Sequence, residues 1–154
     1  DLILSAACTK RAVNIKKGQF MAPWNMDNIV EKMLSCNNEK IILCERGSSF
    51  GYNRLVVDMQ GLVDMRKLGY PVFLDVTHSV QQPGSDRQFT SGNREFVPYL
   101  MCAGLAVGID GVFAEIHPSP EKAISDGPSQ LRLSEMESIL KMARKYDDLR
   151  RGDA

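Results

Sequence analysis

The 154-residue sequence has no excess of charge of either sign, because 19 Lys and Arg residues are matched by 19 Asp and Glu residues. Without a basic excess or a charged tract, nothing indicates binding to nucleic acid or attraction to a membrane surface. Hydrophobic residues make up 44% of the chain. They occur in short runs, and none reaches the roughly 20 residues that a membrane span requires. We therefore expect a protein that binds neither nucleic acid nor membrane.

Cysteine motifs are missing as well. The four cysteines, Cys8, Cys36, Cys44 and Cys102, have no CxxC spacing, and no spacing supports a disulfide. Cys44 lies in a strand-like run and Cys102 in a helix-like pattern, which favours buried free thiols in a reducing compartment. Residues 1–12 begin with an acid and contain no long apolar core, so they do not resemble a secretory signal. These absences predict a cytoplasmic protein.

The informative feature of the chain is a set of four short apolar runs, at residues 13–17, 41–46, 72–78 and 112–117. Each run is too short for a buried helix and is rich in β-branched and aromatic residues, so each predicts a buried strand. Runs that are apolar on both faces are typical of a parallel sheet covered by helices. Each run also ends in a chargeable residue. The carboxyl ends of parallel strands are where barrels and open α/β sheets hold their active sites.

Apolar residues at helical spacing follow every predicted strand. They predict helices over 26–34, 55–63, 96–105 and 134–143, and residues 1–10 look like the end of an earlier helix. Pro98 fits the first turn of its helix, and Ser134 with Glu137 has the form of a capping box. Gly, Pro and Ser mark a long loop at 81–93, which is placed to act as an active-site lid. We expect the charged end, 146–154, to fray.

A helix followed by four strand–helix units predicts an α/β fold in a single domain spanning 1–154. An open doubly wound sheet and half of a (β/α)8 TIM barrel both fit this order. A full barrel needs about 250 residues, and the opening helix has no strand before it. We therefore interpret the chain as the carboxyl-terminal half of a barrel, and we expect the natural molecule to be longer.

Two cations lie at predicted strand ends. Alternation along the strands allows Lys16 and Arg46 to point into one cavity, whereas Lys17 would point outward and be structural or solvated. Arg offers a planar fork for carboxylate or phosphate, and Lys offers a point charge, so the pair predicts an anionic substrate. Salt bridges to neighbours such as Glu45 or Asp75 are the alternative interpretation.

One imidazole and two carboxylates also come from strand ends and the last loop. They are His78, Glu115 and Asp126, a set that suits a divalent metal or general acid–base chemistry. If His78 points into the barrel, alternation places Leu74 and Val76 on the same face. The spacing matches no local metal motif, so His78 as a strand cap and Asp126 as a turn residue remain open alternatives.

Two further features are less specific. Residues 45–53 follow a predicted strand and precede a helix, where backbone amides can hold a phosphate, but the segment lacks both GxGxxG and a GKS or GKT ending. His117 precedes Pro118, so it fits the role of a turn residue as well as that of a site residue.

Four blocks containing these residues resemble the 3-deoxy-D-manno-octulosonate 8-phosphate synthase family. The blocks are VNIKKGQFMAPWNM, ILCERGSSFGYNRLVVDM, DVTHSVQQPG and EIHPSPEKAISDGPSQL. They occur in the family's order and match the second half of its eight-stranded barrel. The resemblance implies a cytoplasmic enzyme, usually a homotetramer, that supplies a precursor of lipopolysaccharide. The first half of the family's barrel, which holds the sugar phosphate, has no counterpart in this sequence.

The resemblance implies condensation of phosphoenolpyruvate with D-arabinose 5-phosphate and water, giving the octulosonate phosphate and phosphate. It implies that Lys16 and Arg46, with Gln19 as a neighbour, hold phosphoenolpyruvate. It also implies that His78 lies beside the phosphate and the metal position and that Asp126 belongs to the catalytic set.

The metal state stays open at this point. Metal-dependent members use His78, Glu115 and Asp126 with a Cys from the first half, and the metal would be Zn, Fe or Mn. Metal-independent members have Asn at that fourth position. Pro128 favours the metal-independent pattern, whereas Ser125 does not match its commoner Cys.

Two rivals remain. The sister heptulosonate phosphate (DAHP) synthases use erythrose 4-phosphate and share the ERG and EIHPSPEKAISDGP-like blocks. They are not expected to carry KKGQFMAPW or THSVQQPG, which favour the octulosonate enzyme. A half-barrel that only binds or assembles, without catalysis, is the alternative outside the class of enzymes.

Overall fold

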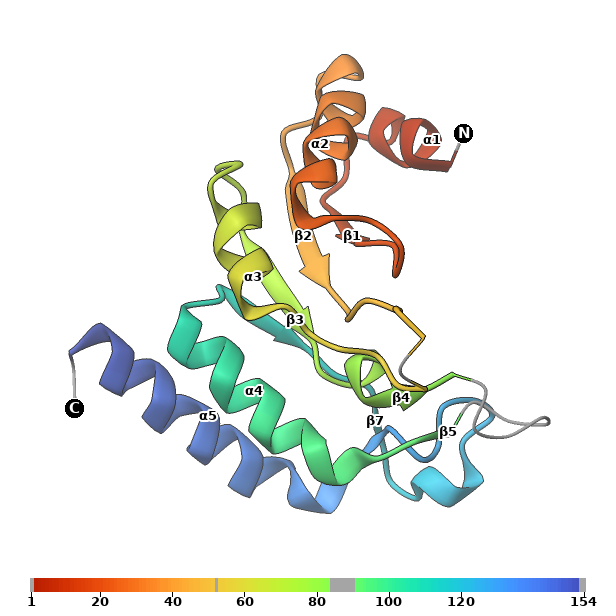
Figure 1. The fold of residues 1–154 in the computed structure, drawn as a ribbon, viewed down its shortest axis with the longest axis vertical. Coiled ribbons are helices and arrows are strands. Elements are labelled where there is room, and N and C mark those ends of the chain that lie inside the picture. The colour runs from red at the N-terminus through yellow and green to blue at the C-terminus, as the bar shows by residue number, and fades with distance from the viewer. Residues whose placement is uncertain (1, 52, 84–90, 153–154) are drawn as a thin grey trace.

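The computed structural model describes residues 2–51, 53–83 and 91–152. Its central sheet has four parallel strands in the order β1 (Val13–Lys16), β2 (Ile41–Glu45), β3 (Val72–Asp75) and β6 (Gly111–Phe113) (Figure 1). Each strand pairs with the next strand along the chain, and the order never reverses. A doubly wound sheet reverses at its switch point. The fold is therefore part of a (β/α) barrel, as predicted.

Helices connect the strands. They are α1 (Leu2–Cys8), α2 (Met26–Ser35), α3 (Met59–Arg66), α4 (Val97–Val107) and α5 (Met136–Arg151). Short 3-10 turns lie at η1 (Pro23–Asn25), η2 (His78–Val80), η3 (Arg94–Phe96), η4 (Pro120–Lys122) and η5 (Leu133–Glu135). α2 contacts β2, α3 contacts β3, and α5 packs along α4 (Figure 1). Within the described ranges, no helix has the length and apolar character needed to cross a bilayer.

The two faces of the sheet differ in burial. Leu43 is in register with Val72, and both are fully buried on the face that the helices cover. Lys16 and Cys44 are in register on the opposite face, where Lys16 is only half-buried. Because residues in register share a face, the cations and the apolar core are separated by strand alternation.

The prediction that Leu74 lines the interior with His78 is wrong. Leu74 lies on the covered face, where a Cβ on Gly104 of α4 would come within 2.8 Å of its side chain. β3 ends at Asp75, and His78 lies in the following 3-10 turn. Alternation therefore does not extend from Leu74 to His78.

Several predicted boundaries are also corrected. The fourth run, 112–117, is divided between β6 and the short strand β7 (Ile116–His117), which pairs with β8 (Leu131–Arg132). The predicted loop at 81–93 begins and ends in an antiparallel pair, β4 (Gln81–Gln82) with β5 (Ser91–Gly92), and 84–90 lies outside the described residues. Residues 55–56 precede α3, because Val56 bridges to Ser48.

The last helix differs at both ends from the prediction. It begins at Met136 after a 3-10 turn and has no side-chain cap, so Ser134 and Glu137 do not form a capping box. Residues 146–151 are helical rather than frayed. Asp147 accepts ion pairs from Arg150 at 3.3 Å and from Arg151 at 2.9 Å. These pairs at i+3 and i+4 support the final turns.

Gly61 is an unfavourable residue for the interior of α3, and packing explains it. A Cβ at this position would lie 2.5 Å from Cγ of Pro23 in η1. A proline ring cannot rotate away, so the close approach of η1 to α3 requires glycine.

We predict that Gly61→Ala destabilises the protein by about 1–3 kcal/mol, because the overlap with Pro23 outweighs the better helix propensity of alanine. Denaturant unfolding measures the change. Gln60→Ala, at the exposed neighbouring position, is the control and should stay within about 0.5 kcal/mol. A Gly61→Ala variant as stable as the wild type would contradict the packing argument.

Candidate active site

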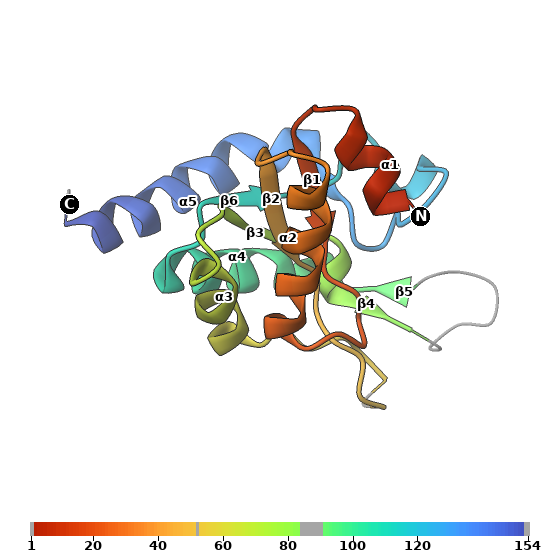
Figure 2. The same cartoon turned by 90° about the horizontal axis from the view of Figure 1, so that it is seen from above.

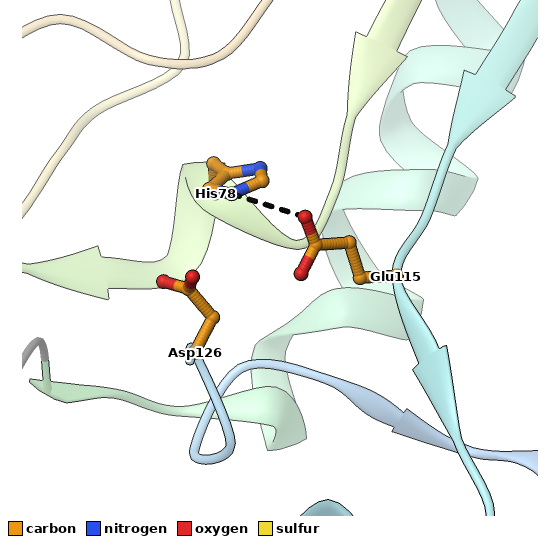
Figure 3. Close-up of side chains that lie close together, drawn as sticks. All are labelled: His78, Glu115 and Asp126. Carbon is orange, nitrogen blue, oxygen red and sulfur yellow. Dashed lines mark ion pairs between the residues drawn. The ribbon is translucent and has the colours of Figure 1, made fainter. Parts of the chain in front are cut away.

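His78, Glu115 and Asp126 converge at the carboxyl end of the sheet. Figure 3 shows their side chains pointing toward one another from η2, from the β6–β7 connection and from the loop before β8. One ligand atom from each residue lies within 4.8 Å of the other two. The His78 Nε2 lies 3.5 Å from Glu115 Oε1. An imidazole with two carboxylates can bind a divalent metal or exchange protons.

Asp75 fixes the orientation of His78. Its Oδ1 accepts a hydrogen bond from the His78 backbone N–H at 2.9 Å, and its Oδ2 lies 2.7 Å from His78 Nδ1. Since an ionised carboxylate only accepts, the proton of a neutral His78 ring is assigned to Nδ1. The Nε2 lone pair then faces Glu115 and the space between the three ligand atoms.

Asp75 is completely buried. Burial by itself raises the pKa of this carboxyl, but hydrogen bonds from the His78 side chain and backbone and from Lys16 outweigh burial. The pKa of Asp75 is therefore held below its ordinary value. Lys16 from β1 and His78 from the turn after β3 are thus tied to one buried anion.

Lys16 is half-buried above this carboxylate. Its Nζ lies 2.5 Å from Asp75 Oδ2 and 3.7 Å from the centre of the Phe113 ring. The salt bridge that sequence analysis kept as an alternative therefore exists, with Asp75 and not with Glu45. The side chain is 31% exposed, so the ammonium still faces the open side of the sheet.

Arg46 reaches the same group through Gln81. Its Nη2 donates to Gln81 Oε1 at 2.8 Å, and Gln81 Nε2 donates to Asp126 Oδ1 at 2.6 Å. The buried Nε of Arg46 has no hydrogen-bond partner among the described residues. The Gln81 amide thus joins the arginine that follows β2 to the carboxylate of Asp126. The Nε of the guanidinium stays free to donate to an anion.

The two carboxylates are also held by protein donors. Gln130 Nε2 donates to Glu115 Oε2 at 3.2 Å, and the Glu115 backbone N–H donates to the Thr77 hydroxyl at 2.8 Å. Asp126 has a left-handed backbone with φ of 54°, and its carbonyl accepts from two later amides in the same turn. Arg94 Nη2 donates to the next carbonyl, that of Gly127, at 2.8 Å. Asp126 therefore forms a turn with its backbone and also belongs to the cluster through its side chain.

Lys17 is structural, as predicted, but it is not solvated. It is 1% exposed, its Nζ lies 3.6 Å from Glu45 Oε1, and it donates to the Ser48 hydroxyl at 3.1 Å. Burial raises the pKa of Glu45 despite the opposing charge of Lys17. Burial, followed by the charge of Asp75, raises the pKa of Cys44 to about 12, so this thiol is no nucleophile at neutral pH.

The remaining predicted residues stand apart from the cluster. The Gln19 backbone carbonyl accepts from the Ser49 amide at 3.0 Å. His117 Nδ1 accepts from the Ser119 amide at 3.0 Å, which is a turn role. Residues 45–53 do not run directly into a helix, because α3 begins at Met59.

Sequence reasoning missed Gln81 and Gln130 as site residues and named Asp75 only as a salt-bridge partner. Asp75 lies at the end of a strand run, three residues before His78, and this position was a usable signal. Gln81 lies in the two-residue strand β4 and Gln130 in the loop before β8, and such short segments carry no periodicity to indicate orientation.

A parallel sheet of this order with a polar cluster at its carboxyl edge is typical of part of a (β/α) barrel. A family model described as the DAHP synthetase I family matches residues 1–151. The chain belongs to this family.

Several curated proteins that resemble this chain carry the same name. The chain is similar to proteins named 2-dehydro-3-deoxyphosphooctonate aldolase, an alternative name of the octulosonate phosphate synthase. The relative from Fusobacterium nucleatum is 58% identical over 152 residues, covering 99% of this chain and 55% of that protein. A Geobacter relative is 52% identical over 147 residues, covering 96% and 54%, and a Cyanothece relative is 57% identical over 140 residues, covering 91% and 51%. The chain spans about half the length of these curated relatives.

We predict a pH-dependent loss of stability in Asp75→Asn. The folded state holds the pKa of Asp75 below its ordinary value of 3.8, so the carboxylate stabilises the fold fully above that value. The stabilisation falls as pH decreases below 3.8, because the unfolded chain then binds a proton first. We expect a deficit of about 1–3 kcal/mol in the free energy of unfolding at pH 7 that narrows below roughly pH 4.

Urea unfolding of the complete protein at a series of pH values measures this deficit. Glu31→Gln, an exposed change on α2, is the control and should stay within about 0.5 kcal/mol throughout. A deficit for Asp75→Asn that grows on acidification would have the wrong sign for a carboxyl with a lowered pKa.

Proposed function

We propose that the complete protein containing this chain is a 3-deoxy-D-manno-octulosonate 8-phosphate synthase. It would condense phosphoenolpyruvate with D-arabinose 5-phosphate and water and release phosphate, for the synthesis of a lipopolysaccharide precursor. The observation that carries the proposal is the convergence of Lys16 and Arg46 with the His78 cluster at one edge of the sheet. The names of the relatives support the same reaction.

Lys16 and Arg46 are the proposed phosphoenolpyruvate ligands. The substrate carries a carboxylate and a phosphate, and two fixed cations at one edge match that pair of anions. The free Nε donor of Arg46 supports this role, because a buried guanidinium N–H is stabilised by an acceptor that the ligand would supply. Gln19 is a neighbour of the ligand in this proposal and depends on the resemblance alone.

In the proposed reaction, carbon 3 of the enol attacks the sugar aldehyde and water adds at carbon 2. The bond between carbon 2 and the phosphate oxygen then breaks, and phosphate leaves. His78 is placed to hold or move a proton at Nε2, since Asp75 keeps Nδ1 protonated. Asp126, held by Gln81, is the second proposed proton-transfer group. The cations stabilise the negative charge that develops while both substrates are held together.

A divalent metal fits the residues present. His78, Glu115 and Asp126 offer an imidazole and two carboxylates, and Asp75, Gln130 and Gln81 orient them from behind, as supporting residues do in metal centres. When bound, Zn, Fe or Mn would polarise an oxygen of a substrate or of water. The fourth ligand would come from outside this chain, so metal dependence rests on that residue. The homotetramer and the cytoplasmic location belong to the same proposal.

We predict that the complete protein consumes D-arabinose 5-phosphate with phosphoenolpyruvate much faster than it consumes erythrose 4-phosphate. Phosphate release with each sugar at equal concentration measures the preference. A preference for erythrose 4-phosphate would move the protein to the heptulosonate branch of its family. The absence of turnover with either sugar would favour a non-catalytic module.

We predict that His78→Ala lowers kcat by about 10²- to 10⁴-fold, the usual contribution of a proton-transfer residue. The same chain offers a matched control in His117→Ala, because His117 is half-buried and serves a turn. That variant should keep turnover within a few-fold of the wild type. Circular dichroism checks that both variants are folded. Equal losses of turnover in the two variants would remove His78 from the mechanism.

A further inference from the structure

Two cysteines meet on the face of the molecule formed by α1 and α2, outside the candidate active site. Cys8 is the last residue of α1, and Cys36 is the residue that ends α2. Their Sγ atoms lie 3.1 Å apart, within hydrogen-bonding distance for thiols. Figures 1 and 2 show the two helices side by side. The expectation that all four thiols are buried is wrong for Cys8, which is exposed, while Cys36 is half-buried.

The backbone around the thiol pair is held in place by hydrogen bonds from both segments. Asn38, which is 3% exposed, donates through Nδ2 to the carbonyls of Ala7 and Arg11, each at 3.0 Å. The Lys10 ammonium donates to the Cys36 carbonyl. The end of α1 and the turn after α2 are therefore joined on either side of the two sulfurs.

We propose that Cys8 and Cys36 form a reversible intramolecular disulfide that links α1 to the end of α2. A disulfide bond is about 2.05 Å long, so the sulfurs need to approach each other by roughly 1 Å. Such bonds in a reducing compartment are transient and respond to oxidants. This site is independent of the proposed synthase function.

The oxidant is a small-molecule disulfide such as oxidised glutathione. The exposed Cys8 thiolate attacks one glutathione sulfur, and one reduced glutathione leaves. The Cys36 thiolate then attacks the Cys8 sulfur of the mixed disulfide and releases the second glutathione. Two protein thiols are oxidised, one small disulfide is reduced, and the two protons pass to the released glutathione thiols.

The bond would close a loop that contains β1 and α2. Closing a loop restricts the unfolded chain, so the oxidised protein should unfold at a higher temperature. Because the two segments are already joined in the folded state, little native rearrangement opposes this gain.

Peptide mapping of the complete protein tests the proposal. The reduced protein is incubated with oxidised glutathione, free thiols are blocked, and a tryptic digest is analysed without reduction. We expect a linked pair of peptides, one containing Cys8 and one containing Cys36, that separates on reduction. We also expect Tm to rise by roughly 5 °C or more on oxidation and to return on reduction.

Matched variants sharpen the test. Cys8→Ser should abolish both the linked peptide and the rise in Tm, whereas Cys102→Ser, on α4, should keep both. Links between two copies, links to Cys44 or Cys102, or glutathione left singly on Cys8 would each overturn the proposal. A correct link without any rise in Tm would overturn the stabilising role assigned to it.

Discussion

The buried carboxylate of Asp75 is the group on which the site depends. A completely buried anion is costly unless charged and hydrogen-bonded partners surround it. Its partners are Lys16 from the first strand and His78 from the turn after the third. Meeting this electrostatic requirement orients the His78 ring and fixes the position of the Lys16 ammonium. The orientation of Nε2 toward Glu115 follows from that arrangement.

Two glutamines extend the same arrangement to the loops. Gln81 joins Arg46 to Asp126, and Gln130 holds Glu115. An amide can donate to one group and accept from another, so it can connect a guanidinium with a carboxylate without adding charge. Hydrogen bonds thus link Arg46 to Asp126 and hold Glu115, while Lys16 and His78 share Asp75, although these residues come from four separate strand–helix units.

Much of the fold could be predicted because its elements are strongly patterned. The four apolar runs supply the four strands of the sheet, although the fourth run continues into β7, and Lys16 and Arg46 lie at strand carboxyl ends as expected. The failures came where tertiary contacts override pattern. Leu74 does not share a face with His78 because β3 ends at Asp75, and the last helix continues to Arg151 because ion pairs support its final turns.

Local chemistry along the chain was enough to establish the order of strands and helices and the kinds of residue at each strand end. The two adjacent lysines show what local chemistry left undecided. Alternation places Lys16 and Lys17 on opposite faces, but only packing made Lys17 a buried partner of Glu45 and left Lys16 half-exposed beside Asp75. Charge pairing depends on distance and desolvation in three dimensions, and residues separated by 28 to 59 positions have no local signal for either.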